Sequence, residues 1–222
     1  KGALVPYGNE YRFGYARSAV NEGRGLEFSS VLTDAPDGTP RRVLLRGTGV
    51  TTLNGGSYTG GIVVEGPAFL SLGGAYALGA TTNLTLRNGA YANFKNANNT
   101  YPANLEIRNE GTNAFHSCGD GNRAVCTIFK GPITGWGKIR LTDQGGVRFT
   151  SASNTFTGTL ELANDHRTHG IEIGIGDGAN CSWKGDRIIQ KTTTSGQNPV
   201  TLTNNFVQVN CNDDFTLETD LG

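Results

Sequence analysis

The densest group of residues that could perform chemistry is the segment NDHRTHG, which holds Asp165, His166 and His169. Two histidines three positions apart beside a carboxylate could hold a zinc ion, because imidazole nitrogens and carboxylate oxygens are its usual ligands. Such a segment is more often a solvated loop between strands. We therefore expect neither a metal ion nor a cofactor here.

Carboxylates are the second source of possible chemistry. Hydrolysis of a glycosidic bond needs two carboxylates at a defined separation. Asp143 could lie near Glu161 or Glu172 on neighbouring turns of the chain, with Arg140 and Arg148 supplying positive charge. Charged residues that point outward from a strand usually serve solubility. We therefore predict no catalytic residue, and a polysaccharide lyase or hydrolase remains the alternative.

Two further types of ligand site have weak support. Asp and Asn lie beside Gly in 118–122, 174–180 and 210–214, and calcium prefers such oxygen donors, but none of these loops has the spacing of a known calcium motif. Aromatic rings could stack against sugars or could simply pack in a core; the candidates are Tyr58, Tyr76, Tyr91, Tyr101, Trp136 and Trp183. Carbohydrate binding therefore also remains an alternative.

Four cysteines are present, at Cys118, Cys126, Cys181 and Cys211. They form no CxxC pair and no zinc-finger spacing. An even number of cysteines is typical of disulfides in an exported protein, and free thiols are the other possibility. Four cysteines allow three pairings. The short segment CGDGNRAVC favours Cys118 with Cys126, which leaves Cys181 with Cys211.

Composition excludes several classes of protein. The 222 residues carry a formal net charge of zero and only 17% charged residues, with no basic run, so we expect no nucleic-acid partner. No apolar stretch approaches the roughly 18 residues of a transmembrane helix. The 33 glycines follow no three-residue period, which excludes collagen.

Short alternating segments rich in Val, Ile, Leu, Thr or Phe recur along the chain, and Gly, Asn or Asp bounds each of them. They occupy 43–47, 61–66, 68–74, 83–89, 104–111, 137–143, 146–151, 158–164, 170–176, 199–205, 206–210 and 215–219. This spacing predicts an all-β fold. The least strand-like stretches, 112–126 and 184–198, are expected to be short loop excursions from a regular scaffold. No composition shift divides residues 1–222, so we expect one domain.

Two internal repeats indicate how the strands are arranged. NLTLRNGAYANF (83–94) is followed 21 residues later by NLEIRNEGTNAF (104–115), and residues 57–66 match 154–163 as aromatic–Thr–Gly followed by a strand. A coil of a parallel β-helix takes about twenty residues. One coil cannot bury its inward face alone, whereas stacked coils share a continuous core. The repeats therefore predict a parallel β-helix, a solenoid.

The offset of 21 residues also predicts a register. Leu84 is expected to stack on Leu105 and Leu86 on Ile107, all pointing inward by strand alternation. The alternate residues then face outward: Thr85, Arg87, Glu106 and Arg108. Arg87 is expected to stack on Arg108, and the nearby carboxylate of Glu106 reduces the repulsion between the two positive charges. Asn88 and Asn109 could form a stacked ladder at a corner or could be ordinary exposed turn residues.

Residues 47–79, GTGVTTLNGGSYTGGIVVEGPAFLSLGGAYALG, resemble the passenger-associated repeat of bacterial autotransporters. YRFGYA (11–16) resembles the lead-in of these repeats, 135–164 resembles a second copy, and 206–222 resembles the beginning of another coil. The resemblance implies a right-handed parallel β-helix carried outside the bacterial cell. Members of this family mostly form stalks, adhesins or surface layers.

We therefore expect a non-catalytic structural or adhesive module of an exported bacterial protein, located extracellularly or at the cell surface. The chain begins at Lys1 and stops straight after a strand-like segment, so we expect a segment excised from a longer surface protein. Its partners would be other copies of itself, through self-assembly, or surface polymers and glycans. The alternative is a carbohydrate-binding or polysaccharide-cleaving β-helix protein.

The cysteine count leads to a first testable prediction. Unfolded, unreduced protein should show no free thiols in a titration with a thiol reagent, because an exported chain with an even number of cysteines normally oxidises fully. Peptide mapping should then find Cys118 joined to Cys126 and Cys181 joined to Cys211. Four titrating thiols would contradict the prediction.

Overall fold

The regular secondary structure of the described residues is almost entirely β-strand. The computed structural model describes residues 6–15, 25–28, 32–73, 75–78, 80–94, 100–117, 126–142, 145–164, 169–173, 187–192, 206–209 and 216–220. Within these ranges the helical structure is a single 3₁₀ turn, η1 (Ala75–Leu78). None of the helical structure in this part of the chain is long and apolar enough to cross a bilayer.

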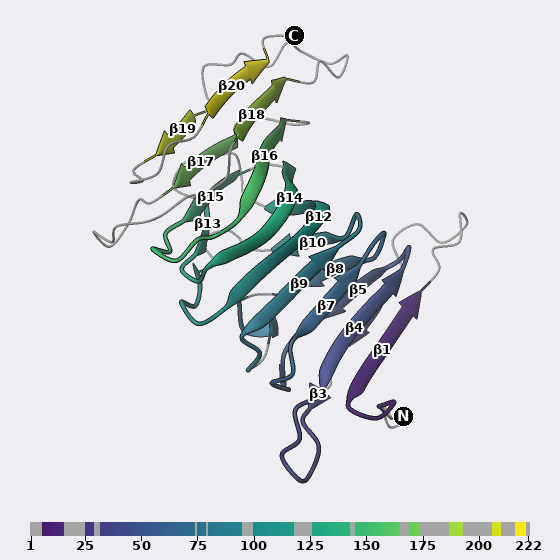
Figure 1. Cartoon of the computed structure of the whole chain (residues 1–222). Coiled ribbons are helices and arrows are strands. Elements are labelled where there is room, and N and C mark those ends of the chain that lie inside the picture. Colours follow the sequence, from purple (N-terminus) through teal and green to yellow (C-terminus); the bar gives the residue numbers. More distant parts are fainter. Residues whose placement is uncertain are drawn as a thin grey trace.

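The strands form three parallel sheets, stacked from the N-terminal to the C-terminal end of the chain (Figure 1). One path through the 13-stranded sheet is β1 (Glu10–Tyr15), β4 (Arg42–Gly47), β7 (Ile62–Glu65), β9 (Asn83–Arg87), β12 (Glu106–Ser117), β10 (Tyr91–Phe94), β8 (Phe69–Leu72), β5 (Val50–Leu53) and β2 (Leu26–Phe28). From β12 the sheet continues through β14 (Ile133–Thr142), β16 (Thr157–Asn164), β18 (Arg187–Thr192) and β20 (Thr216–Asp220).

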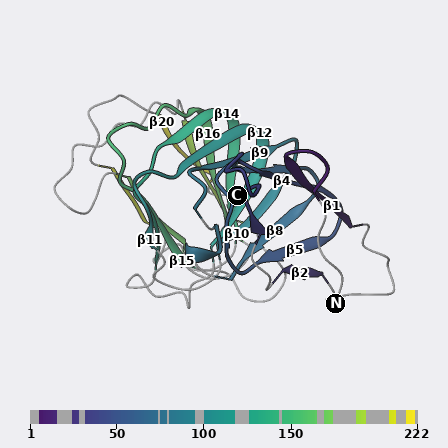
Figure 2. The same cartoon turned by 90° about the horizontal axis from the view of Figure 1, so that it is seen from below.

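The smaller sheets form the remaining wall of the solenoid. The five-stranded sheet contains β11 (Thr100–Tyr101), β13 (Cys126–Phe129), β15 (Gly145–Phe149), β17 (His169–Ile173) and β19 (Phe206–Val209). The two-stranded sheet pairs β3 (Leu32–Thr33) with β6 (Gly56–Ser57). Figure 2 shows β11 and β15 set apart from β4, β9 and β14 of the large sheet.

The large sheet turns a corner at β12, where two branches meet. Residues 106–110 of β12 pair with β9, whereas residues 114–117 pair with β10. We call β1, β4, β7 and β9 the first branch, and β2, β5, β8 and β10 the second branch. Each circuit of the chain therefore adds one strand to each wall, always in the parallel direction. This confirms the predicted all-β parallel β-helix.

The predicted loop excursions were partly wrong. Residues 112–117 continue β12, and residues 187–192 form β18. The segment TNAFHS has a single β-branched residue, Thr112, but Asn113 is held in the core by hydrogen bonds, and Phe115 is buried beside it. A polar residue can thus occupy an inward position when its amide group is satisfied.

The register predicted from the 21-residue repeat was also wrong. Leu84 pairs with Ile107, and Leu86 pairs with Asn109, so equivalent positions lie 23 residues apart. Because residues 104–109 resemble residues 83–88, Leu105 was predicted to lie in a strand. In the structure Leu105 lies in a turn, where its N–H donates to the carbonyl of Pro102 at 3.1 Å.

A shift of two residues preserves which face a side chain occupies. The four residues predicted to point inward are therefore all buried: Leu84, Leu86, Leu105 and Ile107. The proposed stack of Asn88 on Asn109 does not form. Asn88 lies at an exposed corner with φ of 54°, whereas Asn109 is fully buried. The Asn109 side-chain amide donates to the carbonyl of Trp136 at 2.7 Å and accepts from Asn113 at 3.0 Å.

Stacked aromatic rings fill the core beneath the five-stranded sheet. Tyr101, Phe129 and Phe149 occupy equivalent positions of successive coils, with centroids 5.3 and 5.6 Å apart and nearly parallel planes. Phe94 meets Tyr101 and Phe129 edge-on. Such offset and edge-to-face pairs stabilise beyond simple burial. The in-register ladder thus turns one aromatic position into a continuous column.

A column of glycines marks the corner between the branches. Gly111, Gly137 and Gly158 pair in successive coils with φ angles of 96°, 96° and 134°. A Cβ on Gly137 would lie 2.4 Å from the Gly111 carbonyl oxygen, and one on Gly158 would lie 2.1 Å from that of Gly137. Both the backbone angle and the space therefore require glycine at this corner.

The Y-T-G-G segment builds an earlier corner. Tyr58 is fully buried, and Thr59 donates from its backbone N–H and its hydroxyl to Asp34 at 2.9 and 2.8 Å. A Cβ on Gly60 would come within 2.6 Å of the Arg41 backbone, and Gly61 has a φ of 91°. Each residue of this motif therefore has its own packing or hydrogen-bonding role.

Burial in this ladder generates the second prediction. Leu86→Ala should reduce the free energy of unfolding by about 2–5 kcal/mol, because it leaves a cavity among fully buried neighbours. Thr85→Ala, on the outward side of the same strand, should cost less than about 0.5 kcal/mol. Urea unfolding of both variants measures this. Equal losses in the two variants would contradict the assigned sides of β9.

Candidate functional site

Clusters of one carboxylate with two cations are the main polar feature of the outer surface. In each cluster the carboxylate is less exposed than its cations and contacts both of them. The clusters are Glu10 with Arg12 and Arg42, Glu110 with Arg87 and Arg108, and Glu161 with Lys138 and Arg140. Each cluster carries one excess positive charge.

Glu10 shows how such a carboxylate stays ionised. Its side chain is only 8% exposed, and burial alone would raise its pKa. Hydrogen bonds and positive charge from Arg12 and Arg42 outweigh burial and hold the pKa of Glu10 below its ordinary value. Arg42 donates to one carboxylate oxygen through Nε at 2.8 Å and Nη2 at 2.5 Å, and Arg12 donates to the other oxygen.

Charges of opposite sign follow one another along the outer edge of the first branch. Arg46 contacts Glu65 at 2.7 Å, Glu65 pairs with Arg87 in the ladder, and Arg87 contacts Glu110 at 2.7 Å. The predicted stack of Arg87 on Arg108 was wrong, because the 23-residue register places Glu110 opposite Arg87. Arg108 contacts the same carboxylate at 2.8 Å. The surface therefore avoids like-charge stacking.

Glu161, one of the candidate catalytic carboxylates, is engaged in such a cluster. It is 3% exposed, and it accepts hydrogen bonds from Lys138 at 3.0 Å and Arg140 at 2.9 Å. Glu172 lies in β17 of the five-stranded sheet, whereas Glu161 lies in β16 of the large sheet. Asp143 lies outside the described residues. Both predicted pairs, Asp143 with Glu161 and Asp143 with Glu172, therefore include a residue outside the described part of the chain.

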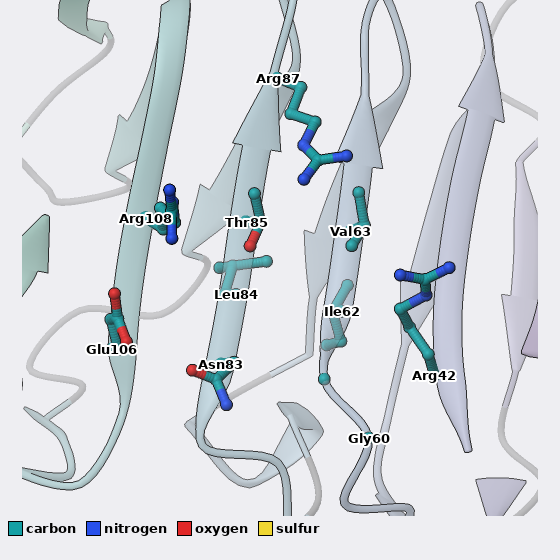
Figure 3. Close-up of a pocket in the computed structure, with 11 residues that line it drawn as sticks. Arg42, Gly60, Ile62, Val63, Asn83, Leu84, Thr85, Arg87, Glu106 and Arg108 are labelled. Carbon is teal, nitrogen blue, oxygen red and sulfur yellow. The ribbon is translucent and has the colours of Figure 1, made fainter. Parts of the chain in front are cut away.

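A hollow of about 270 Å³ opens on the outer surface of the first branch (Figure 3). Figure 3 shows the guanidinium group of Arg87 and one terminal nitrogen of Arg42 turned toward Val63 from the two strands that flank β7. The backbone of Gly60 and Gly61 forms part of the lining of the hollow. The remaining wall carries Asn83, Thr85, Glu106 and Arg108.

A second hollow of about 470 Å³ adjoins the first and shares Arg42 and Gly60 with it. Its rim includes Tyr7, whose residue surface is 72% exposed. The Arg12 guanidinium carbon lies 4.5 Å from the centre of the Tyr7 ring, within the range of a cation–π contact. The two hollows therefore lie side by side across the strands, and we call them together the depression on the first branch.

The other predicted site residues are only partly placed. Asp165, His166, Cys118, Cys181 and Cys211 lie outside the described residues. His169 begins β17 and Cys126 begins β13, with their backbones alone described. Within the described part of the chain, no three His, Cys, Asp or Glu side chains gather as metal ligands. The disulfide pairing remains a prediction.

The candidate sugar-stacking rings divide by burial. Tyr58 and Tyr101 are fully buried in the core, and burial raises the pKa of both hydroxyls far above the ordinary value. Tyr91 stacks on Phe69 at the outer surface with centroids 5.6 Å apart, and Trp136 is 57% exposed. Of the remaining two, Tyr76 lies in η1 with its side chain not described, and Trp183 lies outside the described residues.

Sequence reasoning missed the arginines of the first branch as a group. These arginines lie on different coils of the solenoid, and the pairing of successive strands brings them together. The available signal was the repeated occurrence of Arg two residues from Glu or Arg within a strand, as in EYRF and EIRNEG. Comparison of the chain with protein-family models, curated proteins and solved structures finds no match to any of them.

The charge clusters generate the third prediction. Glu161→Gln should reduce the free energy of unfolding by about 1–2 kcal/mol, less than for a fully buried pair because Lys138 and Arg140 remain partly exposed. The matched control is Glu65→Gln, which removes an exposed pair with Arg46 and should cost under about 0.5 kcal/mol. Urea unfolding compares the two variants. A loss for Glu65→Gln as large as that for Glu161→Gln would contradict the role of burial.

Proposed function

We propose that this chain is a non-catalytic structural or adhesive module of an exported bacterial protein, acting as a rigid β-helical stalk at the cell surface. The observation that carries the proposal is the continuous parallel ladder, whose outer surface presents ion-paired side chains. Stacked coils that each contact only their neighbours form an elongated scaffold. The resemblance of residues 47–79 to passenger-associated repeats supports the same role.

Three described carboxylates, Glu10, Asp34 and Asp37, are unsuited to act as a general acid. A general acid needs a pKa raised toward neutrality. All three have lowered pKa values instead. The guanidinium groups around Glu10 outweigh its burial, backbone N–H groups of Arg41 and Thr59 stabilise ionised Asp34, and that of Thr39 stabilises ionised Asp37.

Carbohydrate binding is the second candidate, and one observation favours it. The depression on the first branch combines arginines with polar groups of Asn83 and Thr85 and with the exposed ring of Tyr7. Sites that bind small ligands are typically concave and carry a few polar groups that fix orientation. An adhesive module with such a depression would attach to a surface glycan.

Surface exposure of the chain is the fourth prediction. Antibodies raised against the purified chain should label intact, unpermeabilised cells of the bacterium that encodes it, because an exported stalk is accessible from outside. Immunofluorescence before and after permeabilisation measures this, with an antibody to a cytoplasmic protein as control. Labelling that appears only after permeabilisation would overturn the cell-surface role.

A separate assay distinguishes the module from an enzyme. The purified chain is incubated with acidic and neutral polysaccharides, and new reducing ends and unsaturated products are measured. We expect neither to exceed the heat-denatured control. Sustained release of either product would replace the non-catalytic role with the alternative of a polysaccharide lyase or hydrolase.

A further inference from the structure

The depression on the first branch is long enough to accept a polymer. Its two hollows share Arg42 and Gly60, and their lining residues come from the edge of β1 as far as β12. Five adjacent strands span about 19 Å at the usual spacing of parallel strands. We call this depression the arginine groove, and it is lined by Arg12, Arg42, Arg87 and Arg108, with Tyr7 at one end.

The walls of the arginine groove favour an anionic occupant. Glu10 is shared by Arg12 and Arg42, and Glu110 is shared by Arg87 and Arg108. The remaining acidic group is Glu106, which accepts a hydrogen bond from the Thr134 hydroxyl at 2.5 Å. Four arginines therefore face three glutamates, which leaves one excess positive charge.

The orientation of the arginines adds geometry to this charge. Arg87 and Arg108 make their closest contacts to Glu110 through Nε. Arg42 contacts Glu10 through Nε and Nη2. Figure 3 shows the guanidinium group of Arg87 and one terminal nitrogen of Arg42 turned toward Val63, whereas the other terminal nitrogen of Arg42 points away from it. Planar guanidinium groups match planar carboxylates through paired hydrogen bonds.

The floor and the end of the groove suit a sugar ring. Val63 contributes a nearly buried apolar side chain to the floor, while Asn83 and Thr85 offer an amide and a hydroxyl beside it. The Tyr7 ring is exposed at the rim and is held against Arg12. The C–H face of a pyranose packs against such a ring, as apolar surfaces do, while its hydroxyl groups remain solvated.

We propose that the arginine groove binds an acidic polysaccharide composed of uronic acids. A carboxylate of the polysaccharide lies between Arg42 and Arg87, and the ring of a neighbouring sugar packs on Tyr7. A uronic-acid chain fits better than a densely charged polymer, because the groove has a single excess charge and each arginine already contacts a glutamate. This inference rests on the proposed adhesive role and names its ligand.

The fifth prediction is that the whole chain binds polygalacturonate oligosaccharides in isothermal titration calorimetry and does not bind neutral dextran. The double variant Arg42→Gln/Arg87→Gln should bind about tenfold or more weakly, because two charge-assisted hydrogen-bonding groups are lost. Tyr7→Ala should also weaken binding without unfolding the protein, since the ring is exposed. The matched control, Arg46→Gln, removes an exposed arginine outside the groove and should change the affinity less than about twofold.

Several outcomes would overturn the groove as a uronate site. One is that the unmodified chain does not bind polygalacturonate at all, and another is that Arg46→Gln loses as much affinity as the double variant. The others are that Tyr7→Ala binds as tightly as the unmodified chain and that single-stranded DNA binds as tightly as polygalacturonate. Failure to bind contradicts the proposed ligand of the groove but not the proposed role as a cell-surface stalk. Binding followed by cleavage overturns the non-catalytic role and leaves the groove standing, so the two proposals fail separately.

Discussion

Parallel, in-register pairing places every side chain about 4.8 Å from the equivalent side chain of the next coil, and the rest of the structure depends on this constraint. Inside, the constraint favours similar residues, because equal shapes stack into continuous columns. Leu84, Ile107 and Ile133 form one such column. Outside, the same constraint penalises similar charges, since two like charges at this spacing repel.

The outer surface resolves this conflict by placing a carboxylate between two cations. Glu110 contacts Arg87 on the preceding coil and Arg108 on its own strand. Glu161 contacts Arg140, which precedes it in the ladder, and Lys138 from the same strand as Arg140. The arrangement satisfies each ion along and across the ladder. At Glu10 the two arginines hold the pKa of the carboxyl below its ordinary value despite its burial.

The corners obey the same spacing and therefore exclude side chains. Where strands bend, successive backbones approach so closely that a Cβ on Gly158 would lie 2.1 Å from the Gly137 carbonyl oxygen. Glycine is required there for space as well as for its positive φ. The glycine richness of the sequence is thus partly a consequence of stacking, and the backbone of Gly60 and Gly61 also lines the depression on the first branch.

Where alternation is clear, strand positions and their inward faces could be predicted, because alternation has a period of two and depends only on local sequence. The predicted segments did not include β1, β5, β10 and β13. Leu84, Leu86 and Ile107 are buried as the alternation required. The register could not be predicted, because the similarity of 83–88 and 104–109 aligned the first two residues of β9 with the turn that precedes β12. An error of two residues leaves every side chain on the correct face but changes its neighbour on the next coil.

The charge clusters depend on those neighbours, which is why the candidate site escaped a linear scan. The sequence is neutral overall and has no basic run, yet the ladder gathers Arg12, Arg42 and Arg87 along one surface from three separate coils. Their charge is largely offset by glutamates in contact with them. Nucleic-acid affinity grows with the number of phosphates neutralised by unpaired cations. The proposed groove has one excess charge and oriented guanidinium groups. It would therefore recognise its ligand through the geometry of hydrogen bonds to individual carboxylates.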